Sequence, residues 1–378
     1  MKPLIPFITA LLISSTCFAT TSTLYMSYGG LTRDFIVHLP TGYVQGQHLP
    51  VVLNFHGYTS NAAEQELYSG MDNTADQNNF IVVYPDGISN SWNVGWTGAY
   101  GTGVDDVGFT GKIIDTLIQL YGIDTNRVYS TGLSNGGFLS HRLACEMSSR
   151  IAAIAAVSGT LTDSTAYYCN PQRLMPIMHI HGTADPIVPY NGLTGSLSTE
   201  QTINFWLARE TCSTPGDTTN VPDTNTGDGS TVQKIDYIHC SASNEVLFYK
   251  ITGGGHTWPG GTLTISQFGN TNRDIDASQE IWNFFNRYTL SGPTGITEQA
   301  QNQTTINLYP NPATSDLKIE STVEIDRAEL INVLGQVVLS KQINAANATI
   351  NLSDIAGGIY FVKMYSGGFS ITRKICKN

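Results

Sequence analysis

Short apolar runs alternate with segments of helical periodicity from about residue 21 to residue 290. Residues 107–121 carry apolar side chains on one face of a helix, and residues 136–147 also have a helical pattern. Apolar strands between helices predict a mostly parallel sheet covered on both faces, with its functional residues at the carboxyl ends of the strands. The runs typical of buried strands are 50–55, 80–84, 127–131, 151–157, 177–180 and 245–251.

The pattern changes near residue 291. Residues 291–305 are polar, with glycine and proline early in the segment, which is typical of a linker. From residue 308 onward no helical period is found, and short alternating runs are separated by turn signals at 334–336 and 366–368. We therefore expect an α/β domain over residues 20–290 and a small all-β sandwich over residues 306–378.

The first 19 residues have the pattern of a secretory signal peptide. Lys2 supplies a positive charge, residues 3–13 are nearly all apolar, and cleavage is expected after Ala19. The apolar run is too short to span a bilayer, and Thr16 disfavours a lipid anchor on Cys17. We expect a protein exported through the periplasm to the cell surface or the medium, with no stable membrane insertion.

Composition and charge narrow the class of partner. Hydrophobic residues make up 41% of the chain and charged residues 13%, so a large core can form. The net charge of −11 argues against nucleic acid or an anionic membrane as partner. We expect a monomer.

Export makes disulfide bonds permissible. Four cysteines of the large domain allow three pairings. The sequential pairing, Cys145 with Cys169 and Cys212 with Cys240, closes the shorter loops and is the one we expect. Histidines and cysteines do not cluster at metal-ligand spacing, so we expect no metal and no cofactor.

A GxSxG motif at residues 132–136 lies between a predicted strand and a predicted helix. In the α/β-hydrolase fold this motif makes a sharp turn that exposes the serine hydroxyl. Chance matches to such a short pattern occur, and the alternative is a glycine-rich turn with a solvated serine. The strand before the motif and the helix after it favour Ser134 as a nucleophile.

A serine hydroxyl needs a base, and in this fold the partners follow in the order serine, aspartate, histidine. Asp185 lies after the strand 177–180 in a loop that Pro186 and Pro189 stiffen, and Asp163 is the alternative acid. His256 lies in a glycine-rich loop after the strand 245–251 and is the expected base.

Other residues near the expected site are assigned supporting roles. The backbone N–H groups of Tyr58 and Asn135 are the expected oxyanion donors. His56 is expected to shape the loop that carries Tyr58, and His179 and His181 to be structural. The loop residues Trp92, Trp96 and Trp258 are candidates for stacking on a sugar or an aromatic acyl group, with packing of the domain rim as the alternative.

Six motifs resemble those of secreted esterases related to polyhydroxybutyrate depolymerases and to feruloyl or acetylxylan esterases. This resemblance covers residues 25–290 and implies the same triad of Ser134, Asp185 and His256, but it leaves the substrate open. The motifs are HGY at 56–58, VVYPDG at 82–87, VDDVGF at 104–109, GLSNGG at 132–137, IHGTADPIVPY at 180–190 and GGGHTWPG at 253–260.

The tail also resembles a known family. Residues 308–313, 330–336 and 358–363 look like a type IX secretion sorting domain. This resemblance implies an export address, removed at the cell surface, and the type IX secretion machinery as a partner. A polymer-binding module is the alternative, and it is disfavoured because the tail contains no tryptophan.

Together these features predict an α/β-hydrolase fold followed by a small all-β sandwich. The expected activity is that of a secreted serine carboxylester hydrolase acting on feruloyl or acetyl esters of plant-wall polysaccharide. A polyester depolymerase is the main alternative, and it is less favoured because the tail resembles a sorting domain. A serine peptidase and a non-catalytic binding or adhesion protein remain open.

Overall fold

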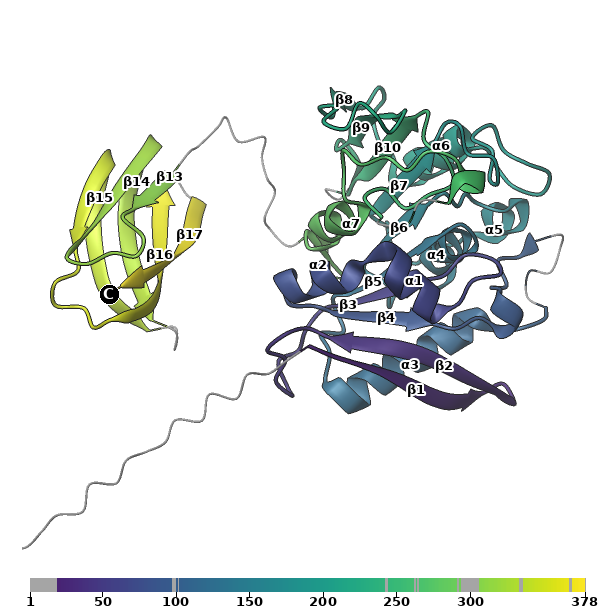
Figure 1. Cartoon of the computed structure of the whole chain (residues 1–378), viewed down its shortest axis with the longest axis horizontal. Coiled ribbons are helices and arrows are strands. Elements are labelled where there is room, and N and C mark those ends of the chain that lie inside the picture. The colour runs from purple at the N-terminus through teal and green to yellow at the C-terminus, as the bar shows by residue number, and fades with distance from the viewer. Residues whose placement is uncertain are drawn as a thin grey trace, which may run out of the picture. The chain divides into compact units, whose positions relative to one another are not determined.

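The computed structural model describes residues 19–96, 100, 102–241, 244–261, 263, 265–290, 292–293, 306–332, 336–366 and 369–377. The chain forms two compact units that divide after Thr297 (Figure 1). The expected signal peptide up to residue 18, nearly all of the expected linker and the turns at 334–335 and 367–368 lie outside the described residues. Among the helices that are described, none is long and apolar enough to cross a membrane.

A ten-stranded sheet forms the large unit, in the order β1-β2-β4-β3-β5-β6-β7-β10-β9-β8. Antiparallel strands lie at both edges (Figure 1), and the strands between them are parallel, which confirms the predicted mostly parallel sheet. The strands are β1 (Thr20–Tyr28), β2 (Leu31–Leu39), β3 (Val51–Phe55), β4 (Ile81–Pro85), β5 (Val128–Leu133), β6 (Ala153–Val157), β7 (Ile177–Gly182), β8 (Asp217–Asn220), β9 (Thr231–Tyr237) and β10 (Val246–Thr252).

Helices cover both faces of this sheet because its central strands are apolar on both sides. Every residue of β3 to β7 is buried, and successive side chains point to opposite faces. One core contains α3 (Asp106–Tyr121), α4 (Asn135–Glu146) and α6 (Thr199–Glu210). The other contains α1 (Ala62–Ser69), α2 (Met71–Asn78) and α7 (Ala277–Phe285).

Shorter elements complete the large unit. The helix α5 (Asp163–Tyr168) follows β6 and begins with Asp163, although the sequence pattern gave no sign of a helix there. The described residues also include the 3₁₀ turns η1 (Ile88–Asn90) and η4 (Ser266–Phe268) and a small ladder of β11 (Tyr288–Thr289) with β12 (Gly292–Pro293).

Both expected disulfide bonds are present. Cys145–Cys169 joins α4 to the residue after α5, and Cys212–Cys240 joins the chain after α6 to the chain after β9. The bonded cysteines are 24 and 28 residues apart in sequence, a loop length for which a disulfide typically contributes about 3 kcal/mol.

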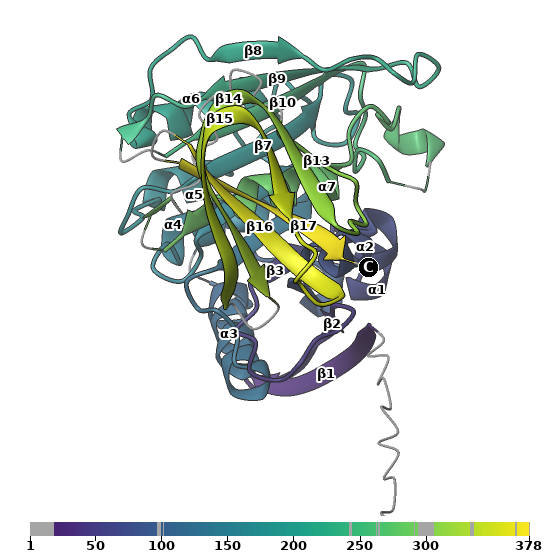
Figure 2. The same cartoon turned by 90° about the vertical axis from the view of Figure 1, so that its left-hand side faces the viewer.

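The small unit is all-β, as predicted. Its strands are β13 (Ile306–Tyr309), β14 (Asp316–Asn332), β15 (Val337–Asn351), β16 (Gly358–Ser366) and β17 (Phe369–Lys377). They form one five-stranded antiparallel sheet, in which the long strand β14 pairs with β13, β15 and β16. Bulges in the β14–β15 ladder let these strands bend along their length (Figure 2) around a separate apolar core.

A buried ion pair joins the edge of the large sheet to the start of α3. The Arg33 Nη2 atom donates to Asp106 Oδ1 at 2.8 Å, and the Arg33 guanidinium lies 3.8 Å from the ring centroid of Phe109. Asp106 Oδ2 also accepts the backbone N–H of Asn93 at 2.7 Å. Burial raises the pKa of Asp106, while the Asn93 N–H and Arg33 act in the opposite direction. The pair therefore fixes β2, α3 and the loop after β4 to one another.

Removal of one partner of this ion pair is expected to destabilise the fold strongly. In the Asp106→Ala variant the Arg33 cation stays buried without its partner, which should lower the free energy of unfolding by about 3–5 kcal/mol. Urea denaturation followed by circular dichroism measures the change. Asp115→Ala is the matched control, because Asp115 lies on the same helix and pairs with Arg150 at the surface. Its loss should cost at most about 1 kcal/mol, and equal losses in the two variants would contradict the interpretation.

Candidate active site

Backbone hydrogen bonds tie together the carboxyl ends of neighbouring strands. The Ser134 N–H, just after β5, donates to Val157 O of β6 at 2.8 Å. From the chain just after β7, Thr183 N–H donates to Ile251 O of β10 at 2.8 Å. Because β6 also pairs with β7, the loops after β5, β7 and β10 begin along one edge of the sheet. The expected residues Ser134, Asp185 and His256 lie in these loops.

Ser134 occupies a strained turn between β5 and α4. Its φ of 55° and ψ of −118° are rare for a residue with a side chain. The turn is sharp because α4 starts in direct contact with the end of β3. A Cβ atom on Gly136 would lie 2.1 Å from the carbonyl oxygen of Phe55. The geometry is that of a nucleophile elbow, the strained strand-to-helix turn that the motif predicts.

Asp185 and His256 are in direct contact and buried. The Nδ1–H group of His256 donates to Asp185 Oδ2 at 2.8 Å. The other carboxylate oxygen accepts the backbone N–H groups of Ile187 and Val188, both at 2.8 Å. With the proton on Nδ1, Nε2 of His256 carries the lone pair that the expected base needs. Asp163, the alternative acid, is the exposed first residue of α5.

The loop that carries His256 packs directly against the end of β7. A Cβ atom on Gly182 would lie 2.2 Å from the carbonyl oxygen of Gly254, so this contact requires glycine. The Ala184 N–H donates to the same oxygen at 2.9 Å, and the His256 N–H donates to Phe268 O at 2.6 Å. These backbone contacts hold His256 beside Asp185.

Two further histidines are buried in β7. The His181 Nε2–H group donates to Val188 O at 2.9 Å, so its Nδ1 accepts from His179 Nε2 at 3.2 Å. Burial lowers the pKa of both rings, which favours their neutral forms. These contacts fit the structural role expected from the sequence. Across the described part of the chain, no group of three or more His, Cys, Asp or Glu side chains is placed to hold a metal ion.

The loop after β3 brings a backbone N–H group toward Ser134. His56 shapes this loop, because its Nδ1–H donates to Gly57 O at 2.7 Å and its Nε2 accepts from Gly87 N–H at 3.0 Å. A Cβ atom on Gly57 would lie 3.5 Å from the Ser134 Cβ. Among the described residues, the backbone N–H groups of Tyr58 and Asn135 have no acceptor, and Asn135 is the first residue of α4. The lack of an acceptor in the described part of the chain fits the expected role of both groups as oxyanion donors.

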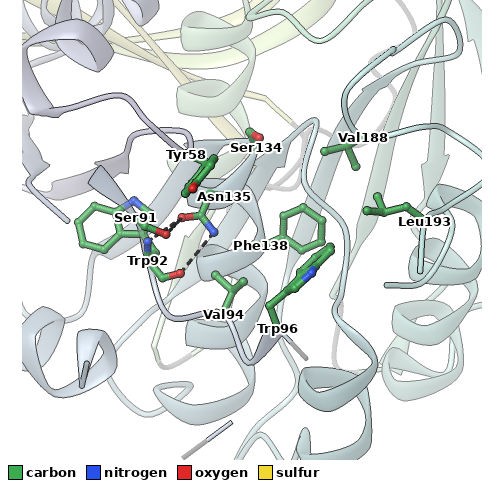
Figure 3. Close-up of a pocket in the computed structure, with 10 residues that line it drawn as sticks. All are labelled: Tyr58, Ser91, Trp92, Val94, Trp96, Ser134, Asn135, Phe138, Val188 and Leu193. Carbon is green, nitrogen blue, oxygen red and sulfur yellow. Dashed lines mark hydrogen bonds between the residues drawn. The ribbon is translucent and has the colours of Figure 1, made fainter. Parts of the chain in front are cut away.

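A pocket of about 360 Å³ opens beside Ser134 (Figure 3). Its walls are mainly apolar and aromatic, and the Trp96 ring meets Phe138 edge-on at 5.2 Å between centroids. Phe138 could have been found from the sequence, since it lies one helical turn after the serine on α4. The lining residues are Tyr58, Ser91, Trp92, Val94, Trp96, Ser134, Asn135, Phe138, Val188 and Leu193.

Side chains from other elements bind the main chain of the loop of residues 91–96. Asn135 Oδ1 accepts the Trp92 N–H at 2.6 Å, and Asn135 Nδ2 donates to Trp92 O at 3.4 Å (Figure 3). The Asn93 N–H is bound by Asp106, and Arg142 Nη1 donates to Asn93 O at 2.7 Å. The residue after the serine thus positions the loop that forms one wall of the pocket.

The three candidate tryptophans lie in different surroundings. Trp96 is half-buried in the pocket wall. Trp92 also lines the pocket, and its Nε1–H donates to His56 O at 2.9 Å. Trp258 has no exposed surface, and its Nε1–H donates to Ser278 Oγ at 3.1 Å. It belongs to the core around α7 and differs from the expected substrate contact, because packing against distant parts of the chain buries it.

Two family models match this chain. Residues 107–224 match the family described as Phospholipase/Carboxylesterase, and residues 307–378 match the family described as Secretion system C-terminal sorting domain. The large unit therefore has the α/β-hydrolase fold, and its central part is similar to carboxylesterases. The small unit is thus similar to the C-terminal sorting domains of secreted proteins, which agrees with the resemblance of the tail motifs.

Several relatives of this chain carry esterase names. A bifunctional acetylxylan esterase/xylanase of Neocallimastix patriciarum is 27% identical over 77% of this chain, which spans only 38% of that protein. A feruloyl esterase D of Neurospora crassa is 26% identical over 70% of this chain and 86% of its own length. The solved acetyl xylan esterase from Aspergillus awamori has the same fold, with a TM-score of 0.50 and 17% identity over 70% of this chain and 99% of that one.

The contact between α4 and β3 generates a test of the elbow. Gly136→Ala would push a methyl group into the Phe55 carbonyl and should lower the free energy of unfolding by about 1–3 kcal/mol, with loss of the Ser134 geometry. Thermal unfolding measures this change. Gly111→Ala is the matched control within α3, where the new Cβ would lie 3.5 Å from its nearest neighbour. It should stabilise the helix by about 0.5–1 kcal/mol. Similar effects of both substitutions would contradict the packing argument.

Proposed function

We propose that this chain is an exported serine carboxylesterase that cleaves feruloyl or acetyl esters on plant-wall polysaccharide. The observation that carries the proposal is the hydrogen bond from His256 to Asp185. It lies at the carboxyl ends of the strands, where Ser134 also occupies its strained turn. The carboxylesterase family match and the relatives named as acetylxylan or feruloyl esterases support the substrate class.

The reaction follows from the roles of these residues. His256 Nε2 takes the proton of Ser134 as the serine Oγ attacks the ester carbonyl. The tetrahedral oxyanion accepts hydrogen bonds from the N–H groups of Tyr58 and Asn135. His256 then gives its proton to the leaving alcohol, and an acyl-enzyme remains. Water, deprotonated by the same imidazole, attacks the acyl carbonyl, and the acid leaves as Ser134 recovers its proton. Asp185 holds the tautomer of His256 and stabilises its cation.

The pocket beside Ser134 favours an aromatic acyl group. Its walls include Trp96, Phe138 and Leu193, and its volume is about 360 Å³. The methyl group of an acetyl ester would fill only a small part of this space. A planar phenylpropenoyl group such as feruloyl matches apolar, aromatic walls. We therefore place feruloyl esters ahead of acetyl esters.

Export by the type IX route would explain the presence of the C-terminal unit and of the disulfide bonds. The C-terminal unit matches a sorting domain, and the large unit holds two disulfide bonds, which persist in oxidising compartments. We propose passage through the periplasm, with the type IX machinery as partner of the small unit. The carboxylesterase would then act at the cell surface or in the medium.

Substitution of the nucleophile tests the activity. Ser134→Ala in the full chain should lower kcat on methyl ferulate by about 10⁴-fold or more, because no acyl-enzyme can form. Ser149→Ala, at an exposed serine, is the control and should leave kcat unchanged. Hydrolysis is measured by release of ferulic acid.

A panel of substrates separates the alternatives. The same proteins are assayed on p-nitrophenyl acetate, acetylated xylan, polyhydroxybutyrate and casein. Clearing of polyhydroxybutyrate alone would assign a depolymerase, and cleavage of casein alone a peptidase. A wild-type chain that is inert on every ester would overturn the enzymatic proposal in favour of a binding protein.

The two candidate acids can be distinguished by matched substitutions. Asp185→Asn should lower kcat by about 10⁴-fold, because an amide no longer holds the required tautomer of His256. Asp163→Asn removes the same charge from the start of α5 and should change kcat less than twofold. Rates on methyl ferulate, with melting temperatures as a check on folding, measure both. A larger loss from Asp163→Asn would reverse the assignment.

A further inference from the structure

Two exposed tyrosines form an aromatic surface on α5. Tyr167 is 81% exposed and Tyr168 is 57% exposed, although both rings are in contact with another ring. Their centroids lie 4.9 Å apart in a T-shaped arrangement, and Tyr168 stacks on Tyr100 at 4.7 Å. We call Tyr167 and Tyr168, with the supporting ring of Tyr100, the tyrosine platform. A contiguous exposed aromatic surface beside a pocket is a candidate interaction site.

The platform is continuous with one wall of the pocket. Thr162, the residue that caps α5, donates from its Oγ1 to Val94 O at 2.9 Å, and Val94 lines the pocket. A Cβ atom on Gly95 would lie 2.8 Å from the Tyr100 ring, so the loop that carries Trp96 packs against the platform. A substrate that places its ester at Ser134 and extends past Trp96 would therefore reach α5.

The platform is held rigidly. Tyr100 lies between Tyr168 and the guanidinium of Arg142, whose Cζ atom is 4.7 Å from the ring centroid. Arg142 Nε also donates to Glu146 at 2.6 Å, on the same face of α4. The residue after Tyr168 is Cys169, whose disulfide bond joins it to Cys145 of α4. Since α4 begins at the residue after Ser134, the platform keeps a fixed position relative to the serine, and little entropy is lost when a ligand binds.

The chemistry of the platform fits a sugar chain. A tyrosine ring offers an apolar face to the C–H groups of a pyranose or furanose ring, and its hydroxyl can bond to sugar hydroxyls. The net charge of −11 disfavours a polyanionic glycan and favours a neutral one. A second copy of this chain is a poor fit, because a stable dimer buries about 800 Å² per partner, far more than two tyrosine side chains.

We propose that the tyrosine platform is a subsite for the neutral polysaccharide backbone that carries the ester. This inference rests on the proposed esterase function and adds the part of the substrate that lies outside the acyl pocket. The pocket beside Ser134 takes the acyl group, and Tyr167 and Tyr168 stack on sugar units one or more residues away from the ester. The platform therefore increases kcat/KM only for esters attached to a sugar chain.

Paired substrates test this subsite in the full chain. The double variant Tyr167→Ala/Tyr168→Ala should lower kcat/KM on feruloylated arabinoxylan about tenfold, the size expected from two aromatic contacts. Its kcat/KM on methyl ferulate, which has no sugar, should stay within twofold of the wild type. Tyr167→Phe/Tyr168→Phe keeps the rings and should retain most of the activity on both. Equal losses on both substrates, or no loss on either, would overturn the proposal.

Further controls separate folding from binding. Tyr167→Ala alone keeps the stack of Tyr168 on Tyr100 and should still weaken the reaction with the polymer selectively. Tyr25→Ala removes a tyrosine that is 72% exposed on β1 and should change neither rate. Affinity electrophoresis in gels containing neutral xylan tests binding without catalysis, using chains that carry Ser134→Ala. Retardation that disappears in the double variant supports the subsite even if no ester is cleaved, and retardation that persists overturns it.

Discussion

The close approach of backbone segments at the end of β3 is the constraint on which the rest of the site depends. Gly136 lets α4 start against the Phe55 carbonyl, and Ser134 takes a positive φ in the turn that results. The same approach places the chain of Gly57 beside the serine and leaves two backbone N–H groups without acceptors in the described structure. A side chain at this contact would move Ser134 away from the chain that carries Tyr58, one of the two expected oxyanion donors. The strain at Ser134 is therefore balanced by packing of main chain on main chain.

Patterns in the sequence predicted the buried strands, the turn at Ser134 and the disulfide bonds. The strands before Ser134, Asp185 and His256 were found because buried parallel strands are continuous apolar runs, and the motif at 132–136 identified the turn. The disulfide pairing also followed from chain distance, because sequential pairs close the shortest loops. Chain order predicted the contact of His256 with Asp185, although neither residue is near the other in sequence.

The remaining features depend on contacts between distant segments, which no local pattern records. Trp258 lies two residues from His256, yet Tyr68 and Ser278 enclose it in the core around α7. The walls of the pocket come from the loops after β3, β4 and β7 and from α4, so Leu193 and Val94 have no shared sequence signal. The short helix α5 escaped prediction because six residues are too few to show a helical period.

The loop of residues 91–96 is fixed largely through amide and carbonyl groups that nearly every amino acid supplies. Asn135, Asp106 and Arg142 bind the main chain of Trp92 and Asn93, and Thr162 binds that of Val94. Mutation can therefore exchange the side chains that face the pocket without releasing the loop that carries them. In the proposed esterase, such an arrangement would let the acyl group that the pocket accepts change by substitution, while the turn at Ser134 and the contact of His256 with Asp185 stay as they are.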